Sequence, residues 1–258
     1  MKVVILAGGF GTRLQEETHK IPKPMVRIGS LPILEHIMNY FYNYGYSDFI
    51  ILTGYKNDVI NDYFFKECKR KLKLQIDNQS IKLDYGFEWN VNLVNTGLDS
   101  TTAKRLYSIK DQIQDTFFLT YGDGLTDIDI SRLLKFHHKN GLIATISAVH
   151  PPARFGLLEI EGSKVIKFTE KGLVKSDFIN GGYFVLEKDI FEYLENLEKS
   201  FEETALPSLA KNDNLAAFKH LGFWQPMDTL REKKELDYLY RNNMAPWVNK
   251  QLENEKEK

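Results

Sequence analysis

Short hydrophobic runs alternate with amphipathic segments along the first half of the chain. A short apolar run bounded by turn residues is typical of a buried strand, and apolar residues at helical spacing indicate a helix. These patterns predict strands at 2–7, 48–52, 117–121 and 143–149, and helices at 32–44, 57–68 and 129–139. Because strands alternate with helices, we expect a parallel sheet joined by right-handed crossovers and flanked by helices.

The second half of the chain is less regular. A hairpin is expected about Gly162 and Ser163, where two apolar stretches flank a turn. Other elements are expected as strands at 157–160, 165–169 and 182–186, and as helices at 188–197, 203–211 and 228–241. The fold class is therefore predicted to be α/β, with a Rossmann-like mixed, mostly parallel sheet flanked by helices and small β insertions.

The predicted domain organisation is simple. The chain has no internal repeat and no linker that would separate independent domains. We expect one domain over 1–258 with a solvated tail at 248–258. Residues 70–90 change from a charged stretch to rough alternation of apolar and polar residues, which predicts a hairpin or extended insertion outside the central sheet. Such an insertion is a candidate for a lid or a contact between subunits.

The composition excludes several classes of protein. The 258 residues are 43% hydrophobic with a net charge of −1, and the basic residues are scattered, so nucleic acid is not an expected partner. No apolar run approaches a transmembrane length, and the first residues lack the architecture of a signal peptide. A single cysteine, Cys68, excludes an internal disulfide and a cysteine-based zinc cluster. We expect a soluble cytoplasmic protein that does not interact with a membrane.

A glycine-rich loop directly follows the first expected strand. The segment Leu6–Arg13 reads LAGGFGTR. Glycine tolerates unusual backbone angles and lets a ligand approach the main chain, so such a loop offers backbone N–H groups to an anion. Arg13 and the proline-flanked Lys23 add two positive charges suited to phosphate oxygens. The pattern predicts binding of a polyphosphate.

Two common phosphate-binding motifs and a common nucleophile motif are absent. The loop lacks the GK[ST] ending of a P-loop, and Leu14 stands where G-x-G-x-x-G requires its last glycine. Taken alone, a glycine loop after a strand also fits a tight turn. No G-x-S-x-G elbow occurs, so covalent catalysis is not indicated. The histidines lack metal-ligand spacing.

Two aspartates are candidate ligands for a divalent cation. Asp123 lies between two glycines at the end of a hydrophobic strand, where ligands of parallel sheets bind. Asp228 follows the bulky segment 223–227. If the fold brings the two carboxylates together near phosphates, Mg²⁺ is favoured, because it takes few carboxylates and keeps water and phosphate ligands. A turn residue at Asp123 and a helix N-cap at Asp228 are the alternative interpretations.

Other polar residues are weaker signals by themselves. Glu170 and Lys171 follow an expected strand, and Asn180 precedes two glycines. Arg105 lies near an expected helix start. Each of these residues also fits an ordinary loop or turn.

Taken together, the motifs resemble those of sugar-1-phosphate nucleotidylyltransferases, from Met1 to about Trp247. The wider family is marked by the Gly8–Arg13 loop, Lys23, Gly122–Gly124, Glu170–Lys171 and Asn180–Gly182. A cytidylyltransferase subgroup is marked by Thr120–Gly124, Pro151–Gly156 and Gly222–Arg231. The last block is long and rich in rare residues, so chance is a poor explanation for it.

The resemblance implies a reaction and an assembly. The subgroup transfers a cytidylyl group from CTP to α-D-glucose 1-phosphate, which gives CDP-glucose for polysaccharide (O-antigen) biosynthesis and releases pyrophosphate. It has the nucleotide-diphospho-sugar transferase fold, uses Mg²⁺ and forms homo-oligomers. We therefore expect CTP and a sugar 1-phosphate as substrates, Mg²⁺ as cofactor and a second copy of the chain as partner.

The resemblance also implies roles for individual residues. Those that would bind the nucleotide are Leu6, Ala7, Gly8, Gly9, Gly11, Thr12, Arg13, Lys23, Ser100 and Arg105. Those that would bind the sugar phosphate are Gly122, Glu170, Lys171, Asn180 and Gly181. Asp123 and Asp228 would carry Mg²⁺, and Arg13, Lys23 and Asp123 would be the catalytic residues.

Three positions depart from the subgroup's pattern. Ile21 stands where a lysine is usual, residues 103–104 replace two glycines, and Gly172 replaces a proline. The last two leave open a different nucleotide or a different phosphorylated acceptor. A non-catalytic nucleotide-binding regulatory subunit is the remaining alternative, and the intact set of charged residues argues against it.

Overall fold

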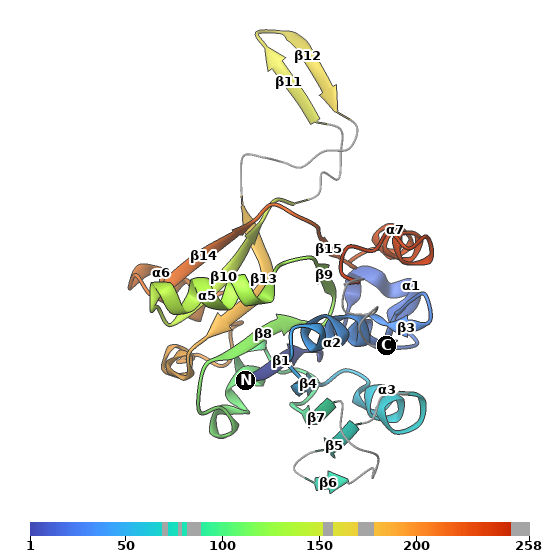
Figure 1. Cartoon of the computed structure of the whole chain (residues 1–258), viewed down its shortest axis with the longest axis vertical. Coiled ribbons are helices and arrows are strands. Elements are labelled where there is room, and N and C mark those ends of the chain that lie inside the picture. The colour runs from blue at the N-terminus through green and yellow to red at the C-terminus, as the bar shows by residue number, and fades with distance from the viewer. Residues whose placement is uncertain (69–71, 77–78, 82–88, 152–156, 170–177, 249–258) are drawn as a thin grey trace.

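One large sheet lies between two layers of helices (Figure 1). The structure, a computed structural model, describes residues 1–68, 72–76, 79–81, 89–151, 157–169 and 178–248. In this part of the chain the sheet has nine strands in the order β14-β10-β13-β8-β1-β4-β7-β5-β6. Of these nine, β13 and β6 run antiparallel to the others. The predicted mixed, mostly parallel α/β sheet is confirmed.

Strands buried on both faces form the middle of the sheet. β1 (Lys2–Leu6) lies between β4 (Asp48–Thr53) and β8 (Phe117–Tyr121), and pairs in parallel with both. Successive side chains of a strand point to opposite faces, so alternate residues of β1 pack into two separate hydrophobic cores. This two-sided burial explains why the sequence shows continuous apolar runs here.

The flanking strands have less uniform sequences. On one side of β8 follow β13 (Ile179–Leu186), β10 (Ala144–Val149) and β14 (Leu215–His220). Beyond β4 lies β7 (Trp89–Asn95). The sequence patterns do not predict β7 or β14, because asparagines interrupt the apolar run of β7 and β14 ends in polar residues on a half-exposed edge.

Residues 70–90 correct one prediction. β5 (Leu72–Ile76) and β6 (Gln79–Ile81) pair as an antiparallel hairpin, as expected. The expected position outside the central sheet is wrong, because β5 also pairs in parallel with β7. Leu74 is fully buried and lies opposite Val91. An edge strand with one covered face shows the same rough alternation as a free hairpin, so the pattern alone cannot separate them.

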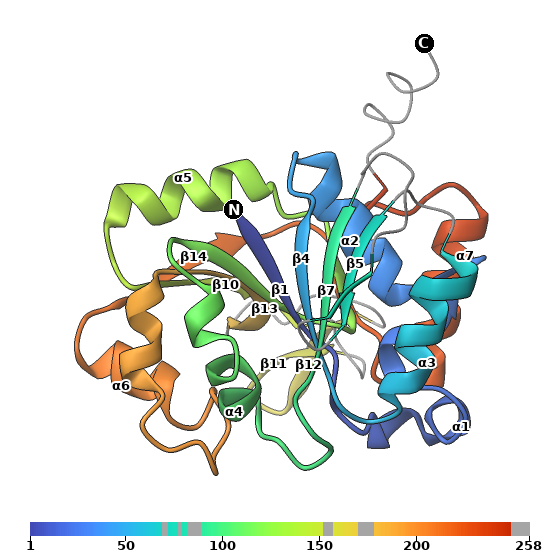
Figure 2. The ribbon, with the colours of Figure 1, turned by 90° about the horizontal axis from the view of Figure 1, so that it is seen from below.

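Helices cover both faces of the sheet (Figure 2). One face carries α2 (Ile33–Asn43), α3 (Asn57–Asp62), α5 (Ile130–Asn140) and α7 (Leu230–Arg241), and the other carries α4 (Thr102–Tyr107) and α6 (Ala205–Lys211). Short elements are α1 (Gln15–Thr18), β2 (Arg27–Ile28), β3 (Leu31–Pro32), and 3₁₀ turns at Thr12–Leu14, Lys23–Met25 and Lys110–Gln112. None of the described helices combines the length and apolarity needed to span a membrane.

Two expected helices take other forms. The helix expected at 57–68 continues from α3 into a π-helical turn at Tyr63–Glu67, closed by the N–H of Cys68 on the carbonyl of Tyr63. The helix expected at 188–197 is a short 3₁₀ helix at Lys188–Tyr193. The apolar residues of this segment have helical spacing, but the short 3₁₀ helix is enough to bury them against α6, so no longer helix is needed. The hairpin about Gly162 is confirmed as β11 (Leu157–Glu161) and β12 (Lys164–Thr169).

The end of the described chain packs against α2. Trp247 is buried, and its indole N–H donates to Nδ1 of His36 at 3.3 Å. Nε2 of His36 lies 2.9 Å from the carbonyl oxygen of Ile28, so this nitrogen carries the proton and the ring is neutral. Val248 packs against the core, and the rest of the predicted 248–258 tail lies outside the described residues.

We expect His36 to make the free energy of unfolding depend on pH. Burial lowers the pKa of His36 below its usual value of 6.5, so the unfolded chain takes up this proton before the folded one. The free energy of unfolding therefore decreases as the pH falls below about 6.5 toward the pKa of His36 in the folded protein. The decrease is at most about 1.4 kcal/mol per pH unit. Urea unfolding from about pH 8 to about pH 5 should show a shallower loss for His36→Gln than for the wild type. The exposed His138→Gln is the control, and equal slopes for all three proteins would contradict the prediction.

Candidate functional site

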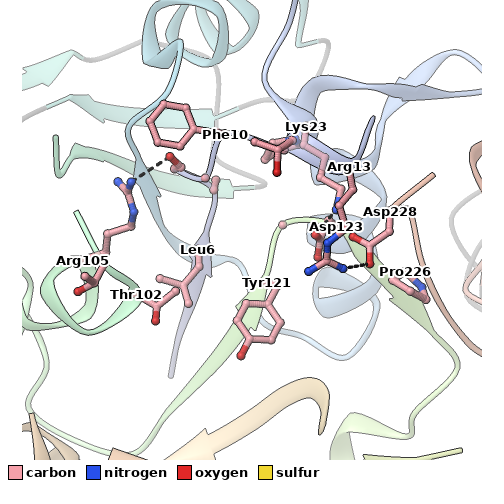
Figure 3. Close-up of a pocket in the computed structure, with 18 of the residues that line it drawn as sticks. Leu6, Phe10, Arg13, Lys23, Thr102, Arg105, Tyr121, Asp123, Pro226 and Asp228 are labelled. Carbon is pink, nitrogen blue, oxygen red and sulfur yellow. Dashed lines mark hydrogen bonds and ion pairs between the residues drawn. The ribbon is translucent and has the colours of Figure 1, made fainter. Parts of the chain in front are cut away.

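A cleft of about 890 Å³ opens at the carboxyl ends of β1 and β8 (Figure 3). Ligands of parallel sheets bind at this end of the strands. The predicted site residues that line it are Leu6, Ala7, Gly8, Gly9, Gly11, Thr12, Arg13, Lys23, Ser100, Arg105, Gly122, Asp123, Asn180 and Asp228. Gly181 lies next to the lining residue Asn180, whereas Glu170 and Lys171 lie outside the described residues.

The glycine loop is packed tightly from behind. Gly11 has a φ of 65°, in the left-handed region that favours glycine, and a Cβ there would lie 2.9 Å from the Thr18 side chain. A Cβ at Gly8 would lie 2.2 Å from the guanidinium of Arg105. Side chains behind these positions therefore leave no room for a Cβ, and the loop's own backbone lines the cleft.

Lys23 lies between two carboxylates in the cleft. Its Nζ is 2.6 Å from Oδ2 of Asp123 and 2.6 Å from Oδ1 of Asp228. The Lys23 side chain is only 10% exposed, and a buried ammonium needs such partners to replace its lost hydration. The fold therefore brings the two predicted metal ligands within reach of one positive charge, although they are far apart in the sequence.

The same two carboxylates keep Lys23 charged. Burial by itself would lower the pKa of Lys23, but Asp123 and Asp228 outweigh burial and raise it. Lys23 is therefore an ammonium at any pH near neutrality. A fixed positive charge in a shielded cleft attracts phosphate groups more strongly than one on the open surface.

A short β ribbon joins the two aspartates. Asp123 follows β8, and Asp228 follows β15 (Trp224–Pro226), which pairs antiparallel with β9 (Gly124–Thr126). The N–H of Met227 donates to the carbonyl of Asp123 at 2.8 Å. The backbones that carry the two carboxylates are thus hydrogen-bonded next to the site, and this pairing sets the spacing between them.

Asp228 is not the N-cap of α7, so that alternative interpretation is wrong. The cap is Thr229, which forms a capping box with Glu232. The Glu232 carboxylate accepts from the N–H groups of Asp228 and Thr229, each at 2.8 Å. Because the next residue caps the helix, the Asp228 carboxylate is directed to Lys23 and Arg13 instead.

Arg13 lies at the exposed edge of this cluster. Its Nη1 is 2.6 Å from Oδ2 of Asp228, and its side chain is 71% exposed (Figure 3). An exposed ion pair of this kind contributes at most about 1 kcal/mol. The guanidinium can therefore exchange Asp228 for another anion in the cleft at little cost.

The aspartate pair fits a divalent cation. Residues in the described part of the chain form no group of three or more His, Cys, Asp or Glu side chains that could hold a metal. An ion held by Asp123 and Asp228 would therefore take its other ligands from substrate or water, as cations at phosphate-binding sites do. The observation that supports the fit is that both carboxylates already converge on a single cation, the Lys23 ammonium.

Arg105 ties the loops of the cleft together from behind. Its buried guanidinium donates to the carbonyls of Thr53, Gly97 and Gly8, each at 2.9 Å, to that of Leu98 at 3.2 Å, and to the hydroxyl of Thr96 at 2.5 Å. These acceptors are the last residue of β4 and residues just beyond β1 and β7. Arg105 is predicted to contact the nucleotide, but its hydrogen bonds to protein atoms favour a positioning role.

Two aromatic residues in the cleft are not among the predicted site residues. Tyr121 and Trp224 line the cleft together with Asn180. The hydroxyl of Tyr121 accepts from Nδ2 of Asn180 at 3.2 Å, and Nε1 of Trp224 donates to the carbonyl of Gly181 at 2.6 Å. Both aromatic residues lie close in sequence to a predicted cation ligand, Asp123 or Asp228, and that proximity is the signal that could have identified them.

The fold and the cleft together define a class of protein. A glycine loop after the first strand of a parallel sheet, with a lysine and two carboxylates at the strand ends, suits binding of nucleotide phosphates with a divalent cation. This is the class of α/β enzymes that transfer phosphoryl or nucleotidyl groups. A sequence model of the family described as nucleotidyl transferase matches residues 2–229. The chain belongs to the nucleotidyl transferase family.

Known relatives cover nearly the whole chain. The glucose-1-phosphate cytidylyltransferase of Salmonella typhi is 44% identical, over 96% of this chain and 98% of the relative. The probable glucose-1-phosphate cytidylyltransferase of Bacillus subtilis (strain 168) is 39% identical, over 96% of this chain and 99% of the relative. The crystal structure of HddC from Yersinia pseudotuberculosis is 26% identical with a TM-score of 0.68, over 93% of this chain and 99% of that chain. The resemblance seen in the motifs is thereby confirmed.

We expect Arg105→Met to lower the free energy of unfolding by about 2–4 kcal/mol, because several buried carbonyl oxygens lose their donor. Lys104→Met, on the same helix but exposed, is the matched control and should stay within about 0.5 kcal/mol of the wild type. Urea unfolding of the three proteins checks this. Equal stabilities for Arg105→Met and the wild type would contradict the positioning role.

Proposed function

We propose that this nucleotidyltransferase transfers the cytidylyl group of CTP to α-D-glucose 1-phosphate, which gives CDP-glucose and pyrophosphate. Similarity over nearly the full chain to glucose-1-phosphate cytidylyltransferases supports both substrates. The structural observation that carries the proposal is the convergence of Lys23, Asp123 and Asp228 beside the glycine loop. One cleft thus offers places for a triphosphate, a cation and a phosphorylated acceptor.

The nucleotide is proposed to bind along the loop Leu6–Arg13 and near Ser100. The backbone of this loop lines the cleft, and its N–H groups are donors suited to phosphate oxygens. Arg13 would leave Asp228 for the triphosphate and stabilise the pyrophosphate as it departs. Arg105 would act indirectly, by keeping the Gly8 backbone in place.

Asp123 and Asp228 are proposed to hold Mg²⁺. When bound, the ion supplies positive charge that offsets the charge of the phosphate oxygens. Lys23 now occupies the same carboxylate oxygens, so in the loaded enzyme its ammonium would turn toward the phosphates. The two carboxylates would therefore keep a cationic partner in both states, and Lys23 would be free to neutralise substrate charge.

The chemistry is an in-line displacement at the α-phosphorus of CTP. A phosphate oxygen of the sugar phosphate forms a bond to the α-phosphorus, and the bond from that phosphorus to the oxygen bridging the β-phosphorus breaks. Pyrophosphate leaves with the electron pair, and the ionised attacking oxygen has no proton to lose. The protein must therefore position two polyanions and reduce their repulsion, rather than transfer protons.

The acceptor is proposed to bind near Gly122, Asn180 and Gly181, with Glu170 and Lys171 from the part of the chain outside the described residues. Asn180 and Gly122 line the cleft on the side of Tyr121. Homo-oligomer formation, a cytoplasmic location and a place in polysaccharide biosynthesis remain predictions from the family resemblance.

Single changes at the charged cluster should greatly reduce turnover without unfolding the protein. We expect Asp123→Asn and Lys23→Ala each to lower kcat by about 10²–10³, because each removes a charge that acts on the phosphates. Pyrophosphate release measures kcat, and circular dichroism checks the fold. The matched controls are Asp129→Asn, where asparagine is an equally good N-cap, and the exposed Lys20→Ala. A folded Asp123→Asn or Lys23→Ala variant with wild-type kcat would contradict the assignment.

A substrate panel tests the proposed function directly. Pyrophosphate release is measured with CTP, UTP, dTTP, ATP and GTP, each with and without glucose 1-phosphate, in Mg²⁺ and again in excess chelator. We expect release only with CTP, glucose 1-phosphate and Mg²⁺ together.

Two other results would change the proposal. Release with CTP and a different phosphorylated acceptor would keep the mechanism and replace the proposed substrate. Tight CTP binding with no release from any pair would favour a regulatory nucleotide-binding subunit.

A further inference from the structure

Glu202 is joined to the cleft by a chain of hydrogen bonds. The hydroxyl of Tyr121 donates to Oε1 of Glu202. Oε2 of Glu202 accepts from the hydroxyl of Thr102 at 2.6 Å. That hydroxyl oxygen in turn accepts from the N–H of Phe201 at 2.8 Å. Both carboxylate oxygens of Glu202 are therefore occupied, each by a side chain that lines the cleft.

This chain sets the orientation of the Asn180 amide. Oδ1 of Asn180 accepts from the N–H of Gly182 at 2.7 Å, and Nδ2 donates to the hydroxyl of Tyr121 at 3.2 Å. A backbone N–H can only donate, so the contact with Gly182 identifies the amide oxygen. Tyr121 has one proton and gives it to Glu202, so its oxygen is left to accept from Asn180. The Asn180 amide is thus held at both ends, by the N–H of Gly182 at Oδ1 and by Glu202, acting through Tyr121, at Nδ2.

The position of Tyr121 is itself set by packing. Its ring lies edge-on to Phe184, with centroids 6.0 Å apart. Gly182 has a φ of 76°, and a Cβ there would lie 2.5 Å from Cδ2 of Tyr121, so glycine is required beside the ring. These contacts hold the ring in place with its hydroxyl against Glu202.

We propose that Glu202 and Tyr121 are positioning residues for the sugar-phosphate half of the reaction. This inference rests on the proposed function and deepens it. Nδ2 of Asn180 has a second N–H, and Asn180 lines the cleft, so this donor is offered to an oxygen of the sugar 1-phosphate. Without Glu202, the Tyr121 proton is free to turn toward Nδ2 of Asn180, so Nδ2 loses the acceptor that holds it in place and its second N–H is no longer fixed toward the substrate.

The first test is a comparison of Michaelis constants for the two substrates. For Tyr121→Phe and Glu202→Ala we expect KM for the sugar 1-phosphate to rise by about 3–10-fold, the effect of one hydrogen bond, and KM for CTP to change by less than about twofold. Glu203→Ala is the matched control, because Glu203 is adjacent, carries the same charge and is exposed. It should change neither constant. Equal rises in both constants would indicate a general structural defect and overturn the proposal.

A double variant tests whether the two residues act through one chain. Tyr121→Phe with Glu202→Ala should raise KM for the sugar 1-phosphate no further than the more severe single variant. Effects that multiply would mean that the residues act independently, which would overturn the proposal.

Two further measurements separate this inference from the proposed function. Wild-type protein is assayed with the 1-phosphates of glucose, galactose and mannose. If another sugar replaces glucose, the proposed acceptor is wrong, and the comparison of KM values is repeated with that sugar. If no acceptor reacts, the side-chain amide resonances of Asn180 in the ligand-free protein are the readout. They should shift in Tyr121→Phe and Glu202→Ala but not in Glu203→Ala, and unshifted resonances would overturn the inference.

Discussion

The ammonium of Lys23 between Asp123 and Asp228 is the interaction on which the cleft depends. Two carboxylates that share a partly buried space repel each other unless a cation lies between them. Lys23 supplies that cation, and the ribbon of β9 and β15 holds the carboxylates at the distance the ammonium requires. Under the proposed function, the carboxylates would exchange the lysine for a metal ion and leave the lysine for phosphate. One arrangement would then serve both as a stabilising contact and as a cation site.

Two other charged side chains, Arg105 and Glu202, are proposed to act through their neighbours and not on the reacting groups. Arg105 is buried and ties the ends of several parallel strands together, so the glycine loop keeps its backbone exposed to the cleft without support from substrate. The chain from Glu202 through Tyr121 gives the Asn180 amide one orientation on the acceptor side. In each case a charged group behind the cleft orders a neutral donor at its surface. Such preorganisation lowers the cost of binding two polyanions side by side.

The sequence was most informative where the structure is locally determined. The apolar runs at β1, β4 and β8 are continuous because both faces of these strands are buried. Each run is therefore recognisable as a strand without knowledge of which strands lie beside it. The glycine loop is recognisable because Gly11 has a backbone conformation that favours glycine, whereas the need for glycine at Gly8 arises from the distant Arg105 side chain. The sequence does not place β5 in the sheet, because an edge strand with one covered face has the same pattern as an isolated hairpin. The sequence also permits Asp228 as a helix cap, a role that Thr229 has in the structure.

By itself, the sequence determined the class of fold, the glycine loop proposed to bind phosphate and the set of charges at the strand ends, because backbone geometry, burial periodicity and residue chemistry are local properties. The tertiary structure decided which charges meet. Lys23, Asp123 and Asp228 come from three distant segments, and only strand pairing through β8, β9 and β15 brings them together. The structure likewise placed Arg105 behind the loop and Glu202 behind Tyr121. Contacts between distant segments are set by packing of the whole sheet, which no local pattern records.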